Sequence, residues 1–425
     1  MLVFSGTAAA ATWLDVNGII KNHSVEIIGQ GSLDANTAII DPNSGKPIEF
    51  VLIGQDSRDG KENQSVGGDF DDVVGNHQAD TTMVAQISAD RTKINLVSIP
   101  RDSLVDVPQC ETTNGTIPAQ YNVMFNSIFA NAYQTGGDLA SAASCTLNAV
   151  NSLTGLNIQN FIVVDFAGLV KMVDAVGGVD LCIPQDVDDP YTSLQLTKGL
   201  HHLNGYQATQ YARTRHGLGD GSDTSRTTRQ QYLIKQLMNE ALSKNLLTDT
   251  AQLYQLAKSA LQSLYISQGM ADTAALAGLA MSLKDFNLSN LYSQTVPVVS
   301  APSDPNRSVW ADEAETLWEK MRADKPIYGS DESEANTNDG SADNSGDSTD
   351  TSAEGTDNAG SQEAAPTPDP VTGLITQADG TLIDPNTGGT VDPEDGSIHD
   401  ALTGQYIGLA DRYLNATVCA VPAKN

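Results

Sequence analysis

The sequence predicts an α/β fold, in which helices cover both faces of a β-sheet. Three short apolar runs between residues 50 and 100 are typical of buried strands. Between residues 157 and 184, a strand pattern, a helix pattern and a second strand pattern follow one another, which is typical of a sheet packed between helices. At 425 residues, the chain is long enough for one large or two medium domains with a buried core.

The first strand pattern ends at charged residues. It runs from Phe50 to Ile53 and breaks at Gly54, which delivers Asp56 and Arg58 into a polar loop. Ligand-binding groups commonly lie just beyond strand ends in α/β proteins. Asp56 and Arg58 are therefore candidate site residues.

A β-hairpin is predicted next along the chain. Two strand patterns, TTMVAQIS and KINLVSIP, are separated by the tight turn ADRT. Asp80 opens the first strand and Arg101 ends the second, so pairing in the hairpin places them side by side. The two residues form either a surface salt bridge or part of a site.

The middle of the chain is predicted to be largely helical. Apolar spacing predicts helices over 121–136 and 138–155, and each is closed by glycine. Residues 226–283 are also predicted to be almost entirely helical, and YSQTVPVV, at 292–299, supplies a late strand. A last helix, over 310–324, closes the domain.

Trp310 and Trp318 belong to this last helical pattern. We expect both rings to be core contacts of the helix.

The charge of the chain is strongly acidic and uneven. The formal net charge is −30, and residues 331–400 contain seventeen Asp or Glu but no Lys or Arg. A nucleic-acid-binding protein needs a basic face, so this composition argues against nucleic acid as a partner. Residues 329–368 consist mainly of small polar and acidic residues with almost nothing to bury, and we predict a disordered acidic linker there.

A repeat with a period of about eight residues follows the linker: DPVTGLI, TQADGTLI, DPNTGGTV, DPEDGSIH and DALTGQYI. Asp-Pro opens a turn, and Gly takes the position that needs a positive φ. We predict a small turn-repeat appendage over 369–425, with very short strands at 369–407, that leans on the main domain; a floppy tail is the alternative. The same unit, DPNSGKPI, stands at 41–48.

The first twelve residues, MLVFSGTAAAAT, are small and apolar. A helix that spans a bilayer needs about twenty residues, and a signal peptide needs a basic start. We interpret residues 1–12 as the remnant of a membrane anchor, with a buried N-terminal segment as the alternative. Residues 13–48 are predicted to be an extended lead-in to the main domain at 49–325.

Four cysteines, at 110, 145, 182 and 419, show no spacing typical of a zinc site. An even number in an exported chain fits two disulfides, and the sequence leaves three pairings open. We favour Cys110 with Cys145 and Cys182 with Cys419; free buried thiols are the alternative.

The segment Tyr211–Gln230 concentrates positive charge. It holds four arginines within seventeen residues, although the chain has only 23 Lys and Arg against 53 Asp and Glu; they are Arg213, Arg215, Arg226 and Arg229. Asn204 is a plausible N-cap for a helix that ends near the first pair. Asp223 or Ser225 can cap a second helix that carries the second pair in its first turn.

Arginines in a first turn repel the positive helix end unless an anion lies between them. The glycine-rich turn GLGDG lets the two pairs converge, and guanidinium groups bind phosphate oxygens in a bidentate manner. A phosphate or pyrophosphate pocket is therefore predicted. Structural salt bridges with Asp220 and Asp223 are the alternative.

The chain contains five motifs in this order: LIGQDSR, DTTMVAQIS, INLVSIPRD, VDFAGLVKMVDAVGGVDLCIP and LNGYQATQYARTRH…SDTSRTTRQQ. Together they resemble the LytR-CpsA-Psr family of cell wall glycopolymer ligases. They span roughly residues 50–240, and the cysteines and acidic composition look like an actinobacterial member. The resemblance implies an α/β domain with a mixed central sheet flanked by helices. It also implies an apolar tunnel for a polyprenyl chain and a magnesium ion beside a pyrophosphate at the tunnel mouth.

The resemblance also implies roles for single residues. Asp56 and Asp80 match the family's carboxylates near Mg²⁺, and either is a candidate base. Arg101, Arg213, Arg215 and Arg226 match its pyrophosphate-binding arginines, and Arg101 and Arg226 are counted with the two carboxylates as catalytic. Arg58 and Arg229 match motif positions with a supporting role in pyrophosphate binding. The segment between Asp56 and Asp80 is longer than in compact members, and GLGDGSD carries an extra residue, so we expect a different pocket rim.

The implied function is transfer of a phosphoglycan from a polyprenyl-diphosphate-linked donor to a peptidoglycan hydroxyl at the extracytoplasmic face of the cell membrane. The attached polymer is a teichoic acid, a capsule or a similar glycopolymer. Arginines with Mg²⁺ held by one or two carboxylates supply the charge neutralisation that phosphoryl transfer requires. A polyprenyl-diphosphate hydrolase and a module that binds lipid diphosphate or wall polymer without turnover are the alternatives. A transcription regulator is disfavoured because no basic helix-turn-helix pattern occurs.

Overall fold

The structure is a computed structural model, and it describes residues 18–20, 22–31, 33, 39–57, 63, 66, 77–243, 258, 261–328, 367–402 and 404–420. The predictions for the anchor remnant, for Arg58 and for nearly all of the acidic linker lie outside these residues. None of the described helices is both long and apolar enough to span a membrane.

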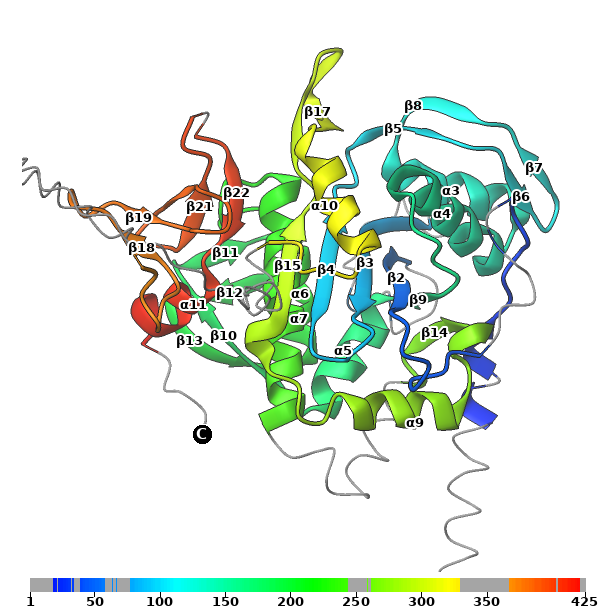
Figure 1. Ribbon diagram of the computed structural model, residues 1–425, viewed down its shortest axis with the longest axis horizontal. Helices are drawn as coiled ribbons and strands as arrows, with labels where there is room; N and C mark the ends of the chain where they lie inside the picture. The colour runs from blue at the N-terminus through cyan, green and yellow to red at the C-terminus, as the bar shows by residue number, and fades with distance from the viewer. Residues whose placement is uncertain are drawn as a thin grey trace, which may run out of the picture.

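A seven-stranded mixed sheet forms the centre of the main domain (Figure 1). Its strands, in spatial order, are β1 (Ser24–Val25), β14 (Leu264–Ser267), β9 (Phe161–Val164), β2 (Ile48–Asp56), β3 (Gln78–Ile87), β4 (Ile94–Ile99) and β15 (Leu291–Thr295). Neighbours β2, β3 and β4 are antiparallel, whereas β9 is parallel to β2 and β15 is parallel to β4. The predicted α/β fold with a mixed sheet is confirmed, and the tunnel stays a prediction.

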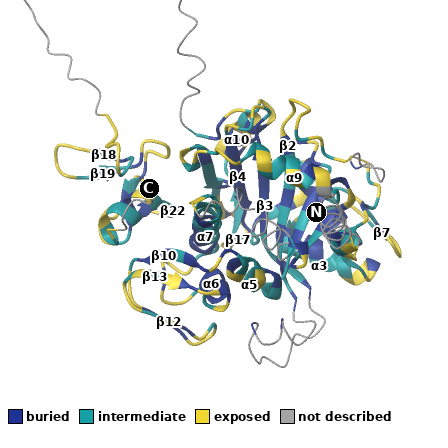
Figure 2. Ribbon diagram, turned by 90° about the horizontal axis from the view of Figure 1, so that it is seen from below, coloured by how far each residue is buried: buried dark blue, intermediate teal, exposed yellow. Residues whose placement is uncertain are grey.

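Helices cover both faces of this sheet because successive strand residues point to opposite sides. Buried Val84 and Val97 belong to the core on one face, which includes residues of α3 (Phe125–Gly136), α4 (Leu139–Thr154) and α10 (Glu313–Arg322). Met83 and Leu96 pack on the other face with α7 (Asp223–Ser243) and α9 (Thr273–Ser282). Figure 2 shows β3 and β4, largely buried, between these layers.

Shorter elements surround this core. Two helices, α5 (Phe166–Ala175) and α6 (Gly205–Arg213), lie close to the ribbons β10–β13 (Val179–Ile183, Gly199–Leu203) and β11–β12 (Val187–Asp189, Leu194–Leu196). Further ribbons are β5–β8 (Leu104–Val107, Gln120–Met124), β6–β7 (Cys110–Thr112, Gly115–Ile117) and β16–β17 (Val298–Ala301, Asp304–Trp310), and 3₁₀ turns lie at Gln268–Met270 and Leu288–Asn290.

The first predicted strand is longer than expected. It does not break at Gly54 but continues to Asp56, with a register shift against β3 between Gly54 and Gln55. A Cβ on Gly54 would lie only 3.0 Å from the Cβ of Thr81. Glycine thus permits a bulge and a close approach of two strands, and a bulge re-aims the residues beyond it.

Two helical predictions were partly wrong. Residues 121–124 belong to β8, which pairs with β5, so the helix starts only at Phe125. Within 226–283, the segment Leu264–Ser267 is a strand of the central sheet rather than helix. Pairing with a distant strand decided both cases, because strand preference depends on tertiary partners more than on local sequence.

The two tryptophans contact each other, as expected for residues that pack together. Their ring centroids are 5.7 Å apart, and Trp318 on α10 is almost fully buried. However, Trp310 is the last residue of β17 and not part of the helix.

The C-terminal repeats form a five-stranded antiparallel sheet. Its strands are β18 (Ile375–Thr376), β19 (Leu382–Ile383), β20 (Thr390–Val391), β21 (Ser397–His399) and β22 (Tyr406–Leu409), and the helical turns α11 (Asp411–Tyr413) and η4 (Leu414–Val418) follow. In each Asp-initiated turn the aspartate C=O accepts from the glycine N–H four residues later, for example Gly388 to Asp384 at 2.8 Å and Gly396 to Asp392 at 2.9 Å. Positive φ values of 71° and 73° at these glycines explain why the repeat needs them.

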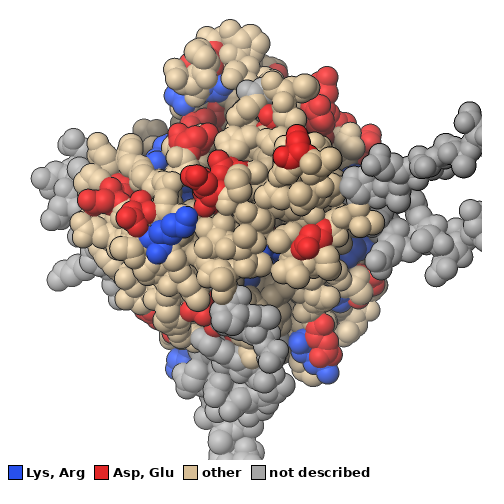
Figure 3. All heavy atoms as spheres, turned by 90° about the vertical axis from the view of Figure 1, so that its left-hand side faces the viewer, with Lys and Arg blue, Asp and Glu red and all other residues tan. Residues whose placement is uncertain are grey.

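The appendage is attached to the main domain. A disulfide joins Cys182 of β10 to Cys419, and a second disulfide joins Cys110 to Cys145, so the favoured pairing is confirmed. Leu414 is buried in a cluster with residues of β10, α6 and α7. Figure 3, which views the side of the molecule where the appendage lies in Figure 1, shows more acidic than basic side chains on this face.

Candidate functional site

Helix α6 carries Arg213 in its last turn and starts where the sequence predicted. Asn204 accepts a hydrogen bond from Gln207 N, and the Gln207 side chain accepts from Asn204 N, which forms a complete capping box. The guanidinium of Arg213 donates to Val66 O at 2.8 Å and lies 4.3 Å from the centre of the Phe166 ring. Arg213 is thereby held against an aromatic face with its charge retained.

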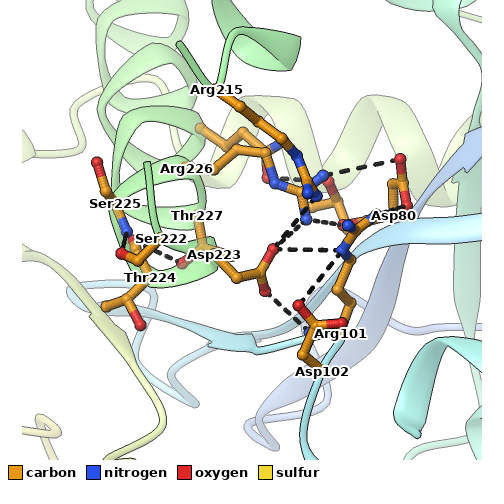
Figure 4. A network of polar contacts seen from close by, with 12 residues as sticks. Asp80, Arg101, Asp102, Arg215, Ser222, Asp223, Thr224, Ser225, Arg226 and Thr227 are labelled. Atoms are coloured by element: carbon orange, nitrogen blue, oxygen red, sulfur yellow. Dashed lines mark hydrogen bonds and ion pairs between the residues drawn. The ribbon is translucent and has the colours of Figure 1, made fainter. Parts of the chain in front are cut away.

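Helix α7 starts at Asp223 and carries Arg226 in its first turn. The Ser222 Oγ accepts from Ser225 N at 3.1 Å, so Ser222 provides the capping contact that the sequence analysis assigned to Asp223 or Ser225. The side chain of Asp223 is instead turned toward the arginines (Figure 4).

The Asp223 carboxylate lies among three arginines. Its Oδ1 is 2.5 Å from Arg226 Nη2, 3.5 Å from Arg101 Nε and 3.8 Å from Arg215 Nη2, and its Oδ2 accepts from Arg101 N at 3.1 Å. The sequence predicted negative charge between these arginines, and the carboxylate of Asp223 supplies one such charge. The salt-bridge alternative therefore holds at Asp223, and a pocket for an external anion stays a prediction.

Asp80 and Arg101 are neighbours, as the hairpin predicted. Arg101 Nη1 donates to Asp80 Oδ1 at 2.6 Å, and Arg226 Nη1 lies 3.7 Å from Asp80 Oδ2 (Figure 4). Burial acts to raise the pKa of Asp80, but the charges of Arg226 and Arg101 outweigh it, so the pKa lies below its usual value. Asp80 is therefore ionised at neutral pH.

The arginine cluster retains hydrogen-bonding capacity. Three buried donor atoms, Arg101 Nε, Arg215 Nη2 and Arg226 Nε, lack a hydrogen-bond acceptor. Burial lowers the pKa of Arg215, and repulsion from Arg226 and Arg101 lowers it further. An additional anion would relieve both the missing hydrogen bonds and the repulsion.

A cavity of about 310 Å³ adjoins the cluster. The predicted site residues that line it are Asp56, Asp80, Arg213, Arg215 and Arg226. One part of the wall is apolar and consists of Val164, Phe166, Leu169 and Ala212. Residues from β2, β3, α6 and α7 thus meet in one place, with charged groups beside an apolar wall.

The residues present fit a magnesium ion. The described residues contain no group of three or more His, Cys, Asp or Glu arranged to hold a metal. Mg²⁺, however, is usually bound by one or two carboxylates together with water and phosphate oxygens. Asp56 and Asp80 line the cavity and provide such oxygens, and a divalent cation beside them would offset the negative charge of the lining.

Arg229 lies away from the cavity lining. Its guanidinium donates to Thr214 O at 2.5 Å, to Ser225 Oγ at 2.7 Å and to Leu218 O at 3.1 Å, and the side chain is buried. These contacts connect α7 to the glycine-rich loop. They agree with a supporting position, and a direct contact of Arg229 with pyrophosphate remains a prediction.

Sequence reasoning missed several residues of the cavity lining. They include Asp189 at the end of β11, Tyr191 of the β11–β12 loop, His216 of the segment after α6, and Gln230 of α7. Gln230 follows Arg226 by one helical turn, a spacing that could have identified it. No local pattern marks Asp189 or Tyr191, because only the tertiary fold brings that loop to Arg215.

Comparisons with known proteins agree with this arrangement. A family model described as the LytR_cpsA_psr family matches residues 16–323. The cell wall biosynthesis protein LcpA of Corynebacterium glutamicum is 29% identical over 288 residues, which cover 64% of this chain and 53% of LcpA. TagU of Enterococcus faecalis, a polyisoprenyl-teichoic acid–peptidoglycan teichoic acid transferase, is 27% identical over 203 residues, which cover 48% of this chain and 56% of TagU.

A solved structure shares the fold. Protein gbs0355 from Streptococcus agalactiae matches with a TM-score of 0.51 and 20% identity, over 67% of this chain and 89% of that chain. The chain spans about half the length of the curated relatives it matches, with 53% and 60% of the first two covered.

Proposed function

Because the chain belongs to the LytR_cpsA_psr family, we propose that it transfers a phosphoglycan from a polyprenyl-diphosphate-linked donor to a peptidoglycan hydroxyl, with Mg²⁺ as cofactor. The observation that carries this proposal is the cavity in which Asp56, Asp80 and three arginines meet beside an apolar wall. The similarity of this chain to LcpA, a cell wall biosynthesis protein, and to TagU, a teichoic acid transferase, supports the same class of reaction.

The arginines bind the diphosphate of the donor. Arg215 and Arg226 have buried N–H groups without acceptors, and Arg213 lines the same cavity. Arg101 holds Asp80 by a hydrogen bond of 2.6 Å, and the charges of Arg226 and Arg101 lower the pKa of Asp80 and keep it ionised. Fixed donors of this kind stabilise the charge that develops on phosphate oxygens in the transition state.

The acceptor hydroxyl attacks the phosphorus on the glycan side. A new bond forms from the hydroxyl oxygen to this phosphorus, and the bond to the bridging oxygen breaks, so that polyprenyl phosphate leaves. Asp56 or Asp80 accepts the proton of the hydroxyl. Asp56 and Asp80 would hold Mg²⁺, which would supply further neutralisation of phosphate charge when bound.

The apolar wall receives the start of the lipid chain. Val164, Phe166 and Leu169 offer a surface for isoprene units next to the arginines. The two disulfides favour an extracytoplasmic location, because disulfides persist in oxidising compartments. We therefore place the protein at the outer face of the cell membrane, where peptidoglycan is available.

The test incubates the full chain with a polyprenyl-diphosphate-linked disaccharide, peptidoglycan oligomers and Mg²⁺, and identifies the products by mass spectrometry. A glycan-phosphate-peptidoglycan adduct together with polyprenyl phosphate is the expected result. Sugar phosphate without an adduct would instead favour a hydrolase. Retention of the lipid without turnover, both with and without Mg²⁺, would favour a binding module.

A further inference from the structure

An exposed aromatic residue lies at the cavity that holds the arginines. Tyr191 is 61% exposed, and the centroid of its ring is 4.6 Å from that of the His216 imidazole at an interplanar angle of 37°. Both residues line the cavity. We propose that Tyr191 and His216 form a platform on which the first sugar ring of the donor stacks; this proposal rests on the proposed function.

The platform is held in a defined position by Asp189, which is fully buried. Its Oδ1 accepts from Tyr191 N at 2.9 Å, and its Oδ2 accepts from Arg215 N at 3.3 Å and from His216 N at 3.5 Å. One carboxylate therefore connects the loop with the tyrosine to the segment with the arginine. The aromatic pair and the diphosphate-binding group are positioned as a unit.

Two further hydrogen bonds fix the same loop. The hydroxyls of Thr192 and Thr214 are 2.9 Å apart, and Gln210 Nε2 donates to Thr192 O at 2.5 Å. The residue next to Tyr191 is thus bound to the end of α6. A large apolar ring on a well-anchored loop has little conformational entropy to lose when it binds a ligand.

The position of the ring indicates a sugar as its ligand. Among the large hydrophobic residues that are exposed in the described part of the chain, Tyr191 is the one that lines this cavity. Aromatic faces bind the apolar C–H surface of a sugar ring, while the Tyr hydroxyl and His nitrogens can meet its hydroxyl groups. The first sugar is bonded directly to the diphosphate, so it must lie next to Arg215 once the arginines are occupied.

The experiment measures the affinity of the full chain for two soluble probes in the presence of Mg²⁺ by calorimetry. The probes are a short-chain polyprenyl diphosphate and the same molecule with one hexosamine on its terminal phosphate. We expect the wild-type chain to bind the sugar-bearing probe about tenfold more tightly. Tyr191→Ala should remove this preference, and Tyr191→Phe should retain it.

Tyr121→Ala is the matched control, because Tyr121 is 74% exposed but does not line the cavity. It should keep the full preference. If wild type binds neither probe, the proposed function itself fails. If wild type binds both and Tyr191→Ala keeps the preference, only the platform is overturned. An unchanged donor affinity with a raised KM for peptidoglycan would assign the ring to an acceptor sugar and overturn the proposal.

Discussion

Helix α7 has two sides that differ in how their polar groups are satisfied. Toward the cavity, Arg226 is 3% exposed and contacts Asp80 and Asp223, yet its Nε has no acceptor. Toward the appendage, the hydroxyl of Tyr232 accepts from Cys182 N at 3.1 Å and donates to Asn415 Oδ1 at 2.6 Å. The first side leaves this donor atom without an acceptor, whereas these groups of the second side are satisfied by the protein.

The appendage side gains further contacts. Lys235 pairs with Asp411, and Leu414 joins the buried cluster around α7. The disulfide between Cys182 and Cys419 closes this side covalently. A buried polar group without a partner costs free energy, and a bound ligand is one way to complete it. We infer that the cavity side of α7 serves binding and that the appendage side serves stability.

The largest expected effect is from Arg226→Ala. We expect transfer to fall about a hundredfold or more, because a fixed donor to the transition state is lost. Product formation by mass spectrometry and circular dichroism of the variant measure activity and fold. Normal transfer by the folded variant would contradict the role of Arg226.

Arg229→Ala is the counterpart on the same helix, one turn further on. It leaves the carbonyl groups of Thr214 and Leu218 without their donor, and we expect a loss of about 2–3 kcal/mol of unfolding free energy in urea. Arg226→Ala should lower transfer more than Arg229→Ala does. If Arg229→Ala lowered transfer more than Arg226→Ala, the assignment of Arg226 to binding and of Arg229 to stability would be wrong.

Asp80→Ala is expected to lower transfer about tenfold to hundredfold and to remove its dependence on Mg²⁺. A titration of activity against Mg²⁺ measures this, with Asp304→Ala as a control, since Asp304 pairs with Arg307 and does not line the cavity. A variant that still responds fully to Mg²⁺ would count against Asp80 as a ligand.

The lowered pKa of Asp80 also predicts a pH dependence of stability. An unfolded Asp has a pKa of about 3.9. The stability that ionised Asp80 contributes is therefore fully present above this pH and is lost as pH falls through the lower pKa of the folded state. In urea unfolding, the difference between wild type and Asp80→Asn should be constant from pH 8 to pH 5 and should shrink below pH 4.

Cys419→Ser tests the covalent closure of the appendage side. We expect the free energy of unfolding to fall by about 2–4 kcal/mol, because the unfolded chain is no longer restrained by the bond. Binding of polyprenyl diphosphate at a temperature where the variant is folded should change little. A loss of binding without a loss of stability would show that the two sides of α7 are coupled.

Tyr232→Phe should have the smallest effect. It removes the hydroxyl that connects Cys182 N to Asn415, and we expect a cost of about 1 kcal/mol, measured by urea unfolding. Transfer should stay at the wild-type rate. A tenfold loss of transfer would instead show that Tyr232 contributes to the reaction, like the residues on the cavity side of the helix.

Much of the site was predictable because its parts depend on near neighbours in the chain. The capping box at Asn204 requires residues three positions apart, and the pairing of Asp80 with Arg101 follows from a short hairpin. The glycines of the C-terminal repeats are also determined locally, since each turn closes within four residues. These features could be predicted because few conformations satisfy such short-range constraints.

Other features depend on residues that are far apart in the sequence. The strand Leu264–Ser267 forms because Phe161–Val164 lies beside it. Tyr191 lies next to His216 because the carboxylate of Asp189 accepts hydrogen bonds from the backbone N–H groups of both residues. Arg226 and Arg229 have the same charge and lie one helical turn apart, and no local rule separates them. The sequence by itself determined the secondary structure patterns, the repeat and the set of charged residues. Only the tertiary structure decided which of those charged groups bond inside the protein and which line the cavity, because that depends on every group that packs around them.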